Sequence, residues 1–193
     1  MNKSVLLASE SKYRKQLLEQ LGFSFTVAPS NIDESPQVNE SPTTLVIRLA
    51  KEKALFQLSN FPKHIIIGSD QVADIDNVSI GKPKTRADAY ETLMACKGRR
   101  IPFHTGLCLI NGEHGKIQTH IDTFYIHYRE YSDKEINNFL DKHLLLSCAG
   151  SIDWQGAGIS LIKKLEGNDP NSLTGLPLIK LCEMFRNINF QII

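Results

Sequence analysis

The sequence has little that points to a secreted, membrane-bound or nucleic-acid-binding protein. It has four cysteines in 193 residues and no CxxC pair, which is typical of reduced thiols in a cytoplasmic protein. No apolar run approaches the roughly 20 residues of a transmembrane helix, and the apolar stretch after Ser4 is too short for a secretory signal. Lys and Arg number 22 against 21 Asp and Glu, so no charge excess favours a polyanionic partner. We therefore expect a cytoplasmic protein that binds neither a membrane nor a nucleic acid polymer.

Zinc-binding spacing is absent as well. The six histidines form no HxxxH or HExxH pair, and we interpret none of them as a zinc ligand. Hydrophobic residues make up 41% of the chain and charged residues 22%, which is enough to bury a core and argues against global disorder. The length fits a single domain over residues 1–193, or two small lobes around a cleft.

Helical and extended patterns alternate along the chain. Apolar runs predict strands at residues 4–8, 23–28, 65–67, 100–110 and 118–128, and a loop followed by a short strand at 150–162. Capping signals and apolar stripes predict helices from Ser11 to about 21, at 42–58, from Thr85 to near 98, from Ser132 onward and at 172–186. This order predicts an α/β fold with a mixed sheet flanked by helices.

The segment from Ser9 to Arg14 lies at the first strand-to-helix junction and is a candidate anion site. A helix N-terminus offers backbone N–H groups and a positive dipole end to a phosphate. The hydroxyls of Ser9 and Ser11 can donate hydrogen bonds, and Arg14 can hold a phosphate with two parallel bonds. The glycines and the GK[ST] ending of a Walker loop are missing. The alternative is a well-capped helix with a solvated arginine.

Three carboxylates are candidates for a hard-cation site. Asp70 follows the strand at 65–67, and ligands of open α/β sheets bind beyond the carboxyl ends of strands. Asp33 and Glu34 lie in a polar loop, and with Asp70 they could complete a Mg²⁺ site that also takes phosphate oxygens. The alternative for Asp70 is a turn aspartate that bonds its own backbone, and the alternative for Asp33 and Glu34 is a loop made soluble by its charges.

Two lysines are candidate phosphate contacts. Lys82 lies in Gly81-Lys82-Pro83-Lys84, where glycine allows a close backbone approach and proline fixes the loop. Lys53 lies in the helix expected at 42–58. The alternatives are a plain surface turn for Lys82 and a solvated helix face for Lys53.

An ordered series of motifs runs through nearly the whole chain. Its members are Leu6-Leu7-Ala8-Ser9-x-Ser11-x-x-Arg14-x-x-Leu17-Leu18, Asp33-Glu34, Ala50-x-Glu52-Lys53-Ala54, Gly68-Ser69-Asp70, Gly81-Lys82-Pro83 and Gly150-Ser151. In this order the series resembles the Maf family of nucleoside triphosphate pyrophosphatases. The chain further looks like the branch that acts on 7-methyl-GTP. That narrower resemblance rests on Gln71 after Asp70, on Phe103-His104-Thr105-Gly106-Leu107, on Cys148-Ala149-Gly150-Ser151 and on residues 165–178.

The resemblance implies a twisted mixed sheet between two lobes, with the nucleotide in the cleft between them and usually a homodimer. It also implies a hydrolase acting on acid anhydrides that depends on a divalent metal cation, Mg²⁺ or Mn²⁺. In that reaction water attacks the α-phosphorus of a nucleoside triphosphate and releases a nucleoside monophosphate and pyrophosphate.

The resemblance assigns a role to each matching residue. Asp70 would act as the general base or orient the water, and Glu34 with Asp70 would hold the metal. The triphosphate would be neutralised by Ser9, Arg14, Lys53 and Lys82. A cluster of cations and a metal around one carboxylate suits phosphoryl transfer, which depends mostly on positioning and charge stabilisation.

Selectivity for the base can be argued physically. The 7-methylguanine ring is cationic, and an aromatic face favours it over guanine by about 1–2 kcal/mol when desolvated. Tyr13 and Trp154 are the candidate faces, with core packing as the alternative for Trp154, and Gln71 can read the base edge. The 7-methyl-GTP branch is expected to have Glu where this chain has Gln155, and Gln155 adds no charge to balance the base.

Two alternatives to 7-methyl-GTP hydrolysis remain open. Gln155 motivates the first, which keeps the chemistry and changes the substrate to another canonical or modified triphosphate. The second is a nucleotide-binding regulator of cell division, since the resembled family has been associated with septum formation. Retention of Asp70, Glu34, Lys53 and Lys82 together argues against that reading, because pure binding does not need the carboxylate pair.

Overall fold

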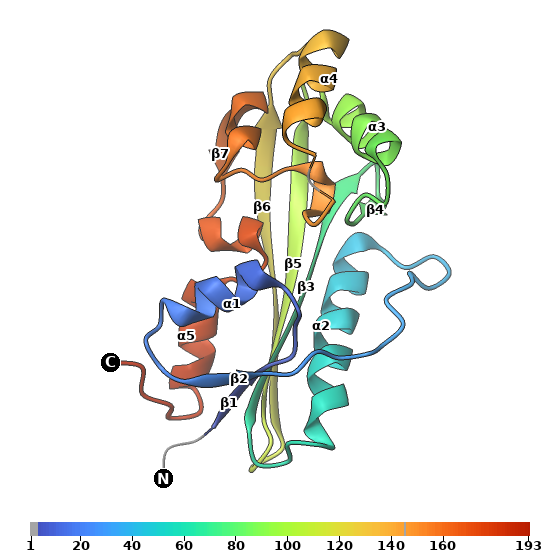
Figure 1. The fold of residues 1–193 in the computed structure, drawn as a ribbon. Coiled ribbons are helices and arrows are strands. Elements are labelled where there is room, and N and C mark those ends of the chain that lie inside the picture. The colour runs from blue at the N-terminus through green and yellow to red at the C-terminus, as the bar shows by residue number, and fades with distance from the viewer. Residues whose placement is uncertain (1–3, 145) are drawn as a thin grey trace. The chain divides into compact units, whose positions relative to one another are not determined.

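Helices and strands alternate in the computed structural model, which describes residues 4–144 and 146–193 (Figure 1). The strands are β1 (Val5–Leu7), β2 (Phe25–Val27), β3 (Ile65–Ile75), β4 (Val78–Ile80), β5 (Arg100–Asn111), β6 (Lys116–Tyr128) and β7 (Ile162–Glu166). The helices are α1 (Lys12–Glu19), α2 (Pro42–Leu58), α3 (Arg86–Cys96), α4 (Asp133–Lys142) and α5 (Leu178–Arg186). Short 3₁₀ turns are η1 (Ala149–Ser151), η2 (Ala157–Leu161) and η3 (Pro170–Thr174).

The strands form a mixed sheet. Its order is β2-β1-β3-β5-β6-β7, and β4 pairs with β3 outside this path. β1 is parallel to both β2 and β3, while the β3–β4 and β6–β7 pairs are antiparallel. The predicted class, an α/β fold with a mixed sheet flanked by helices, is therefore confirmed.

The chain divides into two compact units. The first unit comprises residues 1–70, 105–122 and 169–193, and the second comprises residues 71–104 and 123–168. Strand β3 passes from the first to the second between Asp70 and Gln71. The single domain over residues 1–193 stays a prediction, as does the arrangement of two lobes around a cleft.

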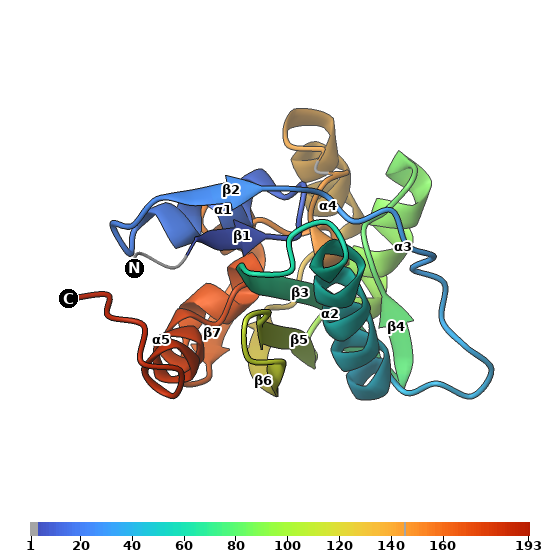
Figure 2. The ribbon, with the colours of Figure 1, turned by 90° about the horizontal axis from the view of Figure 1, so that it is seen from below.

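The first unit has an apolar layer on each face of its strands. Ile65 and Ile67 of β3 pack with α1 and α5, and Ile66 packs with Ala50 and Ala54 of α2 on the opposite face. Alternating side chains of a strand point to opposite faces, so the buried run separates into these two clusters. Figures 1 and 2 show α2 on one side of β3 and α5 on the other.

Glycine in β3 brings the strand and α2 close together. A Cβ atom at Gly68 would lie 2.0 Å from the carbonyl oxygen of Ala50, and one at Gly106 of β5 would lie 2.1 Å from that of Val46. No larger residue fits at either position without moving the helix. The side chains of α2 that follow Ala50 are therefore held directly against β3.

The second unit contains a tight hairpin and a helix pair. Asp76 and Asn77 connect β3 to β4 with positive φ angles of 55° and 64°, the backbone that a two-residue hairpin turn requires. Thr85 and Ser132 begin α3 and α4 with capping boxes, and these two helices lie beside each other (Figure 1). The helix starts predicted at Thr85 and Ser132 are thus confirmed.

Two expected boundaries are wrong. β3 continues to Ile75, so Asp70 lies within the strand rather than beyond its end, because the following Val72, Ala73 and Ile75 are buried and extended. The last helix begins at Leu178 rather than near residue 172, because Gly175 has a left-handed φ of 94° and divides this segment into η3 and α5.

The ion pairs of Glu166 in the second unit should make the stability of the folded protein depend on pH. Glu166 accepts from Arg100 at 2.6 Å, His127 at 2.8 Å and Lys164 at 3.2 Å, and these donors lower its pKa from 4.5 to about 2. Because the folded pKa lies below the unfolded value, the stabilisation is complete well above pH 4.5 and is lost as the pH falls toward 2. We expect Glu166→Gln to lower the Tm at pH 7 and to lower it much less at pH 3. Equal Tm losses at both pH values would contradict this assignment.

Among the residues that the structure describes, no helix combines the length and the apolar character that a bilayer span requires.

Candidate active site

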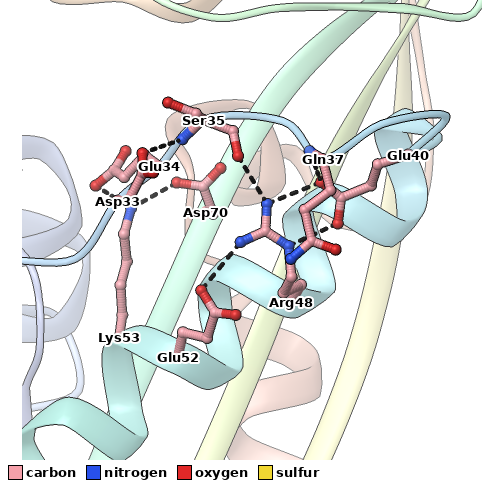
Figure 3. Close-up of polar contacts among 9 residues, drawn as sticks. All are labelled: Asp33, Glu34, Ser35, Gln37, Glu40, Arg48, Glu52, Lys53 and Asp70. Carbon is pink, nitrogen blue, oxygen red and sulfur yellow. Dashed lines mark hydrogen bonds and ion pairs between the residues drawn. The ribbon is translucent and has the colours of Figure 1, made fainter.

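Two carboxylates of the first unit meet at one lysine ammonium. Lys53 Nζ lies 2.7 Å from Asp70 Oδ1 and 2.8 Å from Glu34 Oε1 (Figure 3). Lys53 and Asp70 are buried, with exposed fractions of 6% and 7%, whereas the Glu34 side chain is 56% exposed. The structure thus brings together three residues that are far apart in the sequence and that the motif series had singled out.

Helix α2 and strand β3 place this trio. Lys53 belongs to the buried stripe of α2 that includes Leu49 and Ala50, so its side chain faces the strand rather than solvent. Asp70 lies two residues after Gly68 and therefore points to the same face of β3. The close approach at Gly68 allows a direct ion pair. The alternative in which Lys53 lies on a solvated helix face is excluded.

Glu34 reaches the pair from the loop between β2 and α2. Its neighbour Asp33 does not join the trio, because Asp33 Oδ1 accepts from the backbone N–H of Ser35 at 2.9 Å. Hydrogen bonds from Ser35 lower the pKa of Asp33. Asp33 thus forms a turn around Glu34 and leaves Glu34 as the loop's contact with Lys53.

The predicted anion site also lies in the first unit. Ser11 is the N-cap of α1, and its hydroxyl accepts from the backbone N–H of Arg14. The Ser9 hydroxyl accepts from the backbone N–H of Ser11 and from Arg14 Nη1, both at 3.2 Å. Arg14 is therefore directed across the start of its own helix and is not an unrestrained surface arginine.

A backbone carbonyl fixes Arg14 from the other side. The carbonyl oxygen of Gly175 accepts from Arg14 Nε at 2.8 Å and from the Ser69 hydroxyl at 2.8 Å, and Ser69 also contacts the Gly106 carbonyl. Sequence reasoning missed Ser69 and Gly175 as supports of Arg14. Ser69 could have been found from its position next to Asp70 in a strand. Adjacent strand residues point to opposite faces of the sheet, so the Ser69 hydroxyl lies on the face opposite to Asp70. The long-range partner Gly175 left no signal in the sequence.

The Arg14 guanidinium interacts electrostatically with the carboxylates of Asp70 and Glu34. Burial lowers the pKa of the Arg14 guanidinium, and the negative charges of Asp70 and Glu34 raise it. An arginine remains charged throughout the working range of proteins, so Arg14 adds a second fixed positive charge in the field of this carboxylate pair.

The remaining predicted site residues are found in both units. Tyr13 is partly buried in α1 of the first unit, with Lys12 Nζ 5.0 Å from its ring centroid. Gln71 and Trp154 are partly buried in the second unit, where Gln155 is exposed. Their roles in base recognition stay predictions.

Lys82 lies in a loop of the second unit. It is exposed beside buried Pro83, and the carbonyl of Gly81 accepts from the backbone N–H of Gly150 at 3.1 Å. This bond joins two members of the motif series, the Gly81-Lys82-Pro83 loop and the Gly150-Ser151 turn. The loop is therefore anchored, and Lys82 projects from an anchored backbone.

The donor set fits a divalent cation that is shared with a phosphate. Within residues 4–144 and 146–193 no group of three or more His, Cys, Asp or Glu side chains could hold a metal by itself. Mg²⁺ typically takes only one or two protein carboxylates and completes its shell with water and phosphate oxygens. Asp70 and Glu34 supply two carboxylates that both contact the Lys53 ammonium, and carboxylate oxygens are ligands that Mg²⁺ and Mn²⁺ prefer.

The sequence matches a known protein family over most of its length. A family model described as Maf-like protein matches residues 4–188. Among solved structures, that of the Ham1 protein of Staphylococcus aureus superposes with a TM-score of 0.44 at 12% identity, covering 65% of this chain and 72% of that chain.

Proposed function

Since the chain belongs to the Maf-like protein family, we propose that it is a nucleoside triphosphate pyrophosphatase that prefers 7-methyl-GTP. The reaction cleaves the bond between the α-phosphorus and the bridging oxygen, and water supplies the new oxygen on the monophosphate. Pyrophosphate is the leaving group. The observation that carries the proposal is the meeting of Asp70, Glu34 and Lys53 in one unit with Arg14 in their field.

Asp70 is the residue assigned to the attacking water. Its Oδ1 accepts from Lys53, so Oδ2 is the oxygen that would take the proton from the water. The buried ammonium of Lys53 balances the charge of Asp70 and fixes the carboxylate plane. Orientation of this kind is the main contribution that a protein makes to phosphoryl transfer.

The cations supply the second requirement, which is stabilisation of the charge on the phosphates. Arg14 is held by Ser9 and by the Gly175 carbonyl, so its guanidinium is pre-organised for phosphate oxygens. Lys53 and Lys82 are proposed as further phosphate contacts. A fixed guanidinium loses little side-chain freedom when a phosphate binds.

Asp70 and Glu34 are proposed to hold a divalent cation, Mg²⁺ or Mn²⁺, as members of this family generally require. When bound, such a cation would neutralise phosphate charge and polarise the α-phosphate. The homodimer and the cytoplasmic location expected from the sequence remain part of the proposal.

Preference for the 7-methyl base is proposed to come from aromatic and amide groups. Tyr13 and Trp154 offer aromatic faces for a cationic ring, and Gln71 offers an amide for the base edge. Gln155 lacks the negative charge that would balance the methylated base, so we expect Gln155→Glu to increase the preference for 7-methyl-GTP over GTP about 10-fold. The ratio of kcat/KM for the two substrates measures this. An unchanged ratio would show that Gln155 does not contribute to recognition of the base.

The proposed activity is tested by pyrophosphate release from the purified protein with Mg²⁺ or Mn²⁺. The substrates to compare are 7-methyl-GTP, GTP, dTTP, UTP, CTP and ATP. We expect metal-dependent release that is fastest with 7-methyl-GTP. Release that is fastest with another triphosphate would support the pyrophosphatase reaction and contradict the proposed preference for 7-methyl-GTP. Tight nucleotide binding without release would favour the regulator of cell division.

A further inference from the structure

The loop that carries Glu34 is held from two directions. It extends from Pro29 to Glu40 and joins β2 to α2. At its start, the carbonyl of Pro29 accepts from the side-chain amide of Gln57, which is buried in α2. Between this anchor and α2 the loop is polar and largely exposed, so it needs a second restraint if Glu34 is to keep one position.

Arg48 of α2 supplies this restraint. Its Nε lies 2.6 Å from Glu40 Oε1 and its Nη2 lies 2.8 Å from Glu40 Oε2, which is a bidentate pair. The same Nη2 donates to the backbone carbonyl of Ser35 at 3.0 Å. Figure 3 shows the guanidinium between these two points of the loop. One rigid side chain therefore holds both the residue after Glu34 and the end of the loop.

Glu40, which pairs with Arg48, also binds the backbone of the loop. Its Oε2 also accepts from the backbone N–H of Gln37 at 2.9 Å, and its side chain is only 4% exposed. The hydrogen bonds and charge of Arg48 lower the pKa of Glu40, and the paired carboxylate raises the pKa of Arg48. The pair is thus enclosed and charged, which distinguishes it from an ordinary surface ion pair.

Glu34 lies at the centre of this arrangement. Asp33 closes a turn onto the N–H of Ser35, and Arg48 holds the carbonyl of that same Ser35. The backbone on the C-terminal side of Glu34 is therefore fixed through both its N–H and its C=O groups. Its carboxylate is directed onto Lys53, which lies on the helix that also carries Arg48.

We propose that Arg48 and Glu40 are positioning residues that hold Glu34 in place to bind the divalent cation. The proposal deepens the proposed function and rests on the assignment of Glu34 as a metal ligand. Support of a ligand by a second layer of residues typically changes metal affinity or activity by about 10- to 100-fold. A lysine at position 48 keeps the charge but loses the planar fork that reaches Glu40 and Ser35 together.

Glu52 provides a matched control. It lies one helical turn after Arg48 and accepts from Nη1 at 3.0 Å, on the side of the guanidinium that makes no loop contact. Glu52→Gln removes an ion pair from Arg48 within α2 and leaves the bonds to Glu40 and Ser35 unchanged. A general structural role of Arg48 would respond to this substitution, whereas a loop-positioning role would not.

The experiment compares wild type with Arg48→Lys, Glu40→Gln, the double variant and Glu52→Gln. Hydrogen exchange at the Ser35 and Gln37 amides reports on the loop, and electron paramagnetic resonance of Mn²⁺ reports on metal affinity. We expect either single variant to speed loop exchange and to weaken Mn²⁺ binding about 10-fold. The double variant should add less than about 2-fold to either single one, because both break the same contact. Glu52→Gln should stay within about 2-fold of wild type.

Kinetics supply a further readout. Weaker placement of a metal ligand should raise the KM for Mn²⁺ about 10-fold and leave kcat at saturating Mn²⁺ within about 3-fold of wild type. Loop exchange and Mn²⁺ affinity that match wild type in Arg48→Lys would overturn the proposal. If the wild type hydrolyses no triphosphate, the proposed function fails, and hydrogen exchange at Ser35 and Gln37 still decides whether Arg48 holds the loop.

Discussion

Asp70→Asn is expected to reduce kcat for pyrophosphate release about 100- to 10,000-fold, the range seen when a general base is removed. The amide has the shape of the carboxylate, and its oxygen can still accept from Lys53, so the variant should fold. It cannot take a proton from water, and it contributes one negative charge less to a divalent cation. Initial rates at saturating metal and substrate measure the loss.

The matched control for this prediction is Asp74→Asn, four residues further along the same strand. Asp74 lies in the second unit, where its Oδ2 is 3.3 Å from His104 Nε2. We expect the control to keep kcat within about 3-fold of wild type. A kcat for Asp70→Asn that equals that of the control would show that Asp70 is not the base.

Lys53→Met is expected to affect both stability and activity. Asp70 is buried and pairs with Lys53 Nζ at 2.7 Å, so the substitution leaves a buried carboxylate without this ion pair. Breaking a buried pair on one side typically costs about 3 kcal/mol. For a chain of this length we expect a Tm lower by about 10 °C. Pyrophosphate release should also be lost, because Asp70 and Glu34 would no longer be held at one point.

Lys51→Met controls for the loss of a lysine from the same helix. Lys51 is exposed, and we expect its substitution to change the Tm by less than about 2 °C. Unfolding of the three proteins by scanning calorimetry at pH 7 compares them directly. If Lys53→Met kept the Tm and the rate of wild type, the ion pair with Asp70 would have no importance for fold or chemistry.

Local signals in the sequence predicted much of the fold. Ser11, Thr85 and Ser132 are N-caps in the structure, as the hydroxyl-bearing residues before apolar stripes had indicated. The β-branched run at 65–67 is a strand that is buried on both faces. These features depend on residues that are close together in the chain, so a single sequence is enough to show them.

The end of β3 and the start of α5 were less accessible to sequence reasoning. Gly68-Ser69-Asp70 resembles the end of a strand, but Gly68 serves close packing against α2 and the strand continues past Asp70. The left-handed conformation of Gly175 is set by its surroundings, where its carbonyl accepts from Ser69 and Arg14. Glycine can mark either a turn or a close approach, and only tertiary packing decides which.

The site was predicted as a set of residues but not as a set of contacts. The motif series singled out Asp70, Glu34 and Lys53 together, and the structure adds that Lys53 joins the two carboxylates. The support from Arg48 and Glu40 left no pattern in the sequence, because the two residues flank the start of a helix and meet only when the loop folds back. The contacts of Lys82, Gln71 and Gln155 with a nucleotide remain predictions.

The most direct test of the proposed reaction is the fate of oxygen from labelled water. The purified protein would hydrolyse 7-methyl-GTP with Mn²⁺ in water enriched in heavy oxygen, and mass spectrometry would locate the label. Attack at the α-phosphorus predicts a single labelled oxygen in the nucleoside monophosphate and unlabelled pyrophosphate. Label in the pyrophosphate, or release of orthophosphate in its place, would contradict the reaction proposed for Asp70 and its partners.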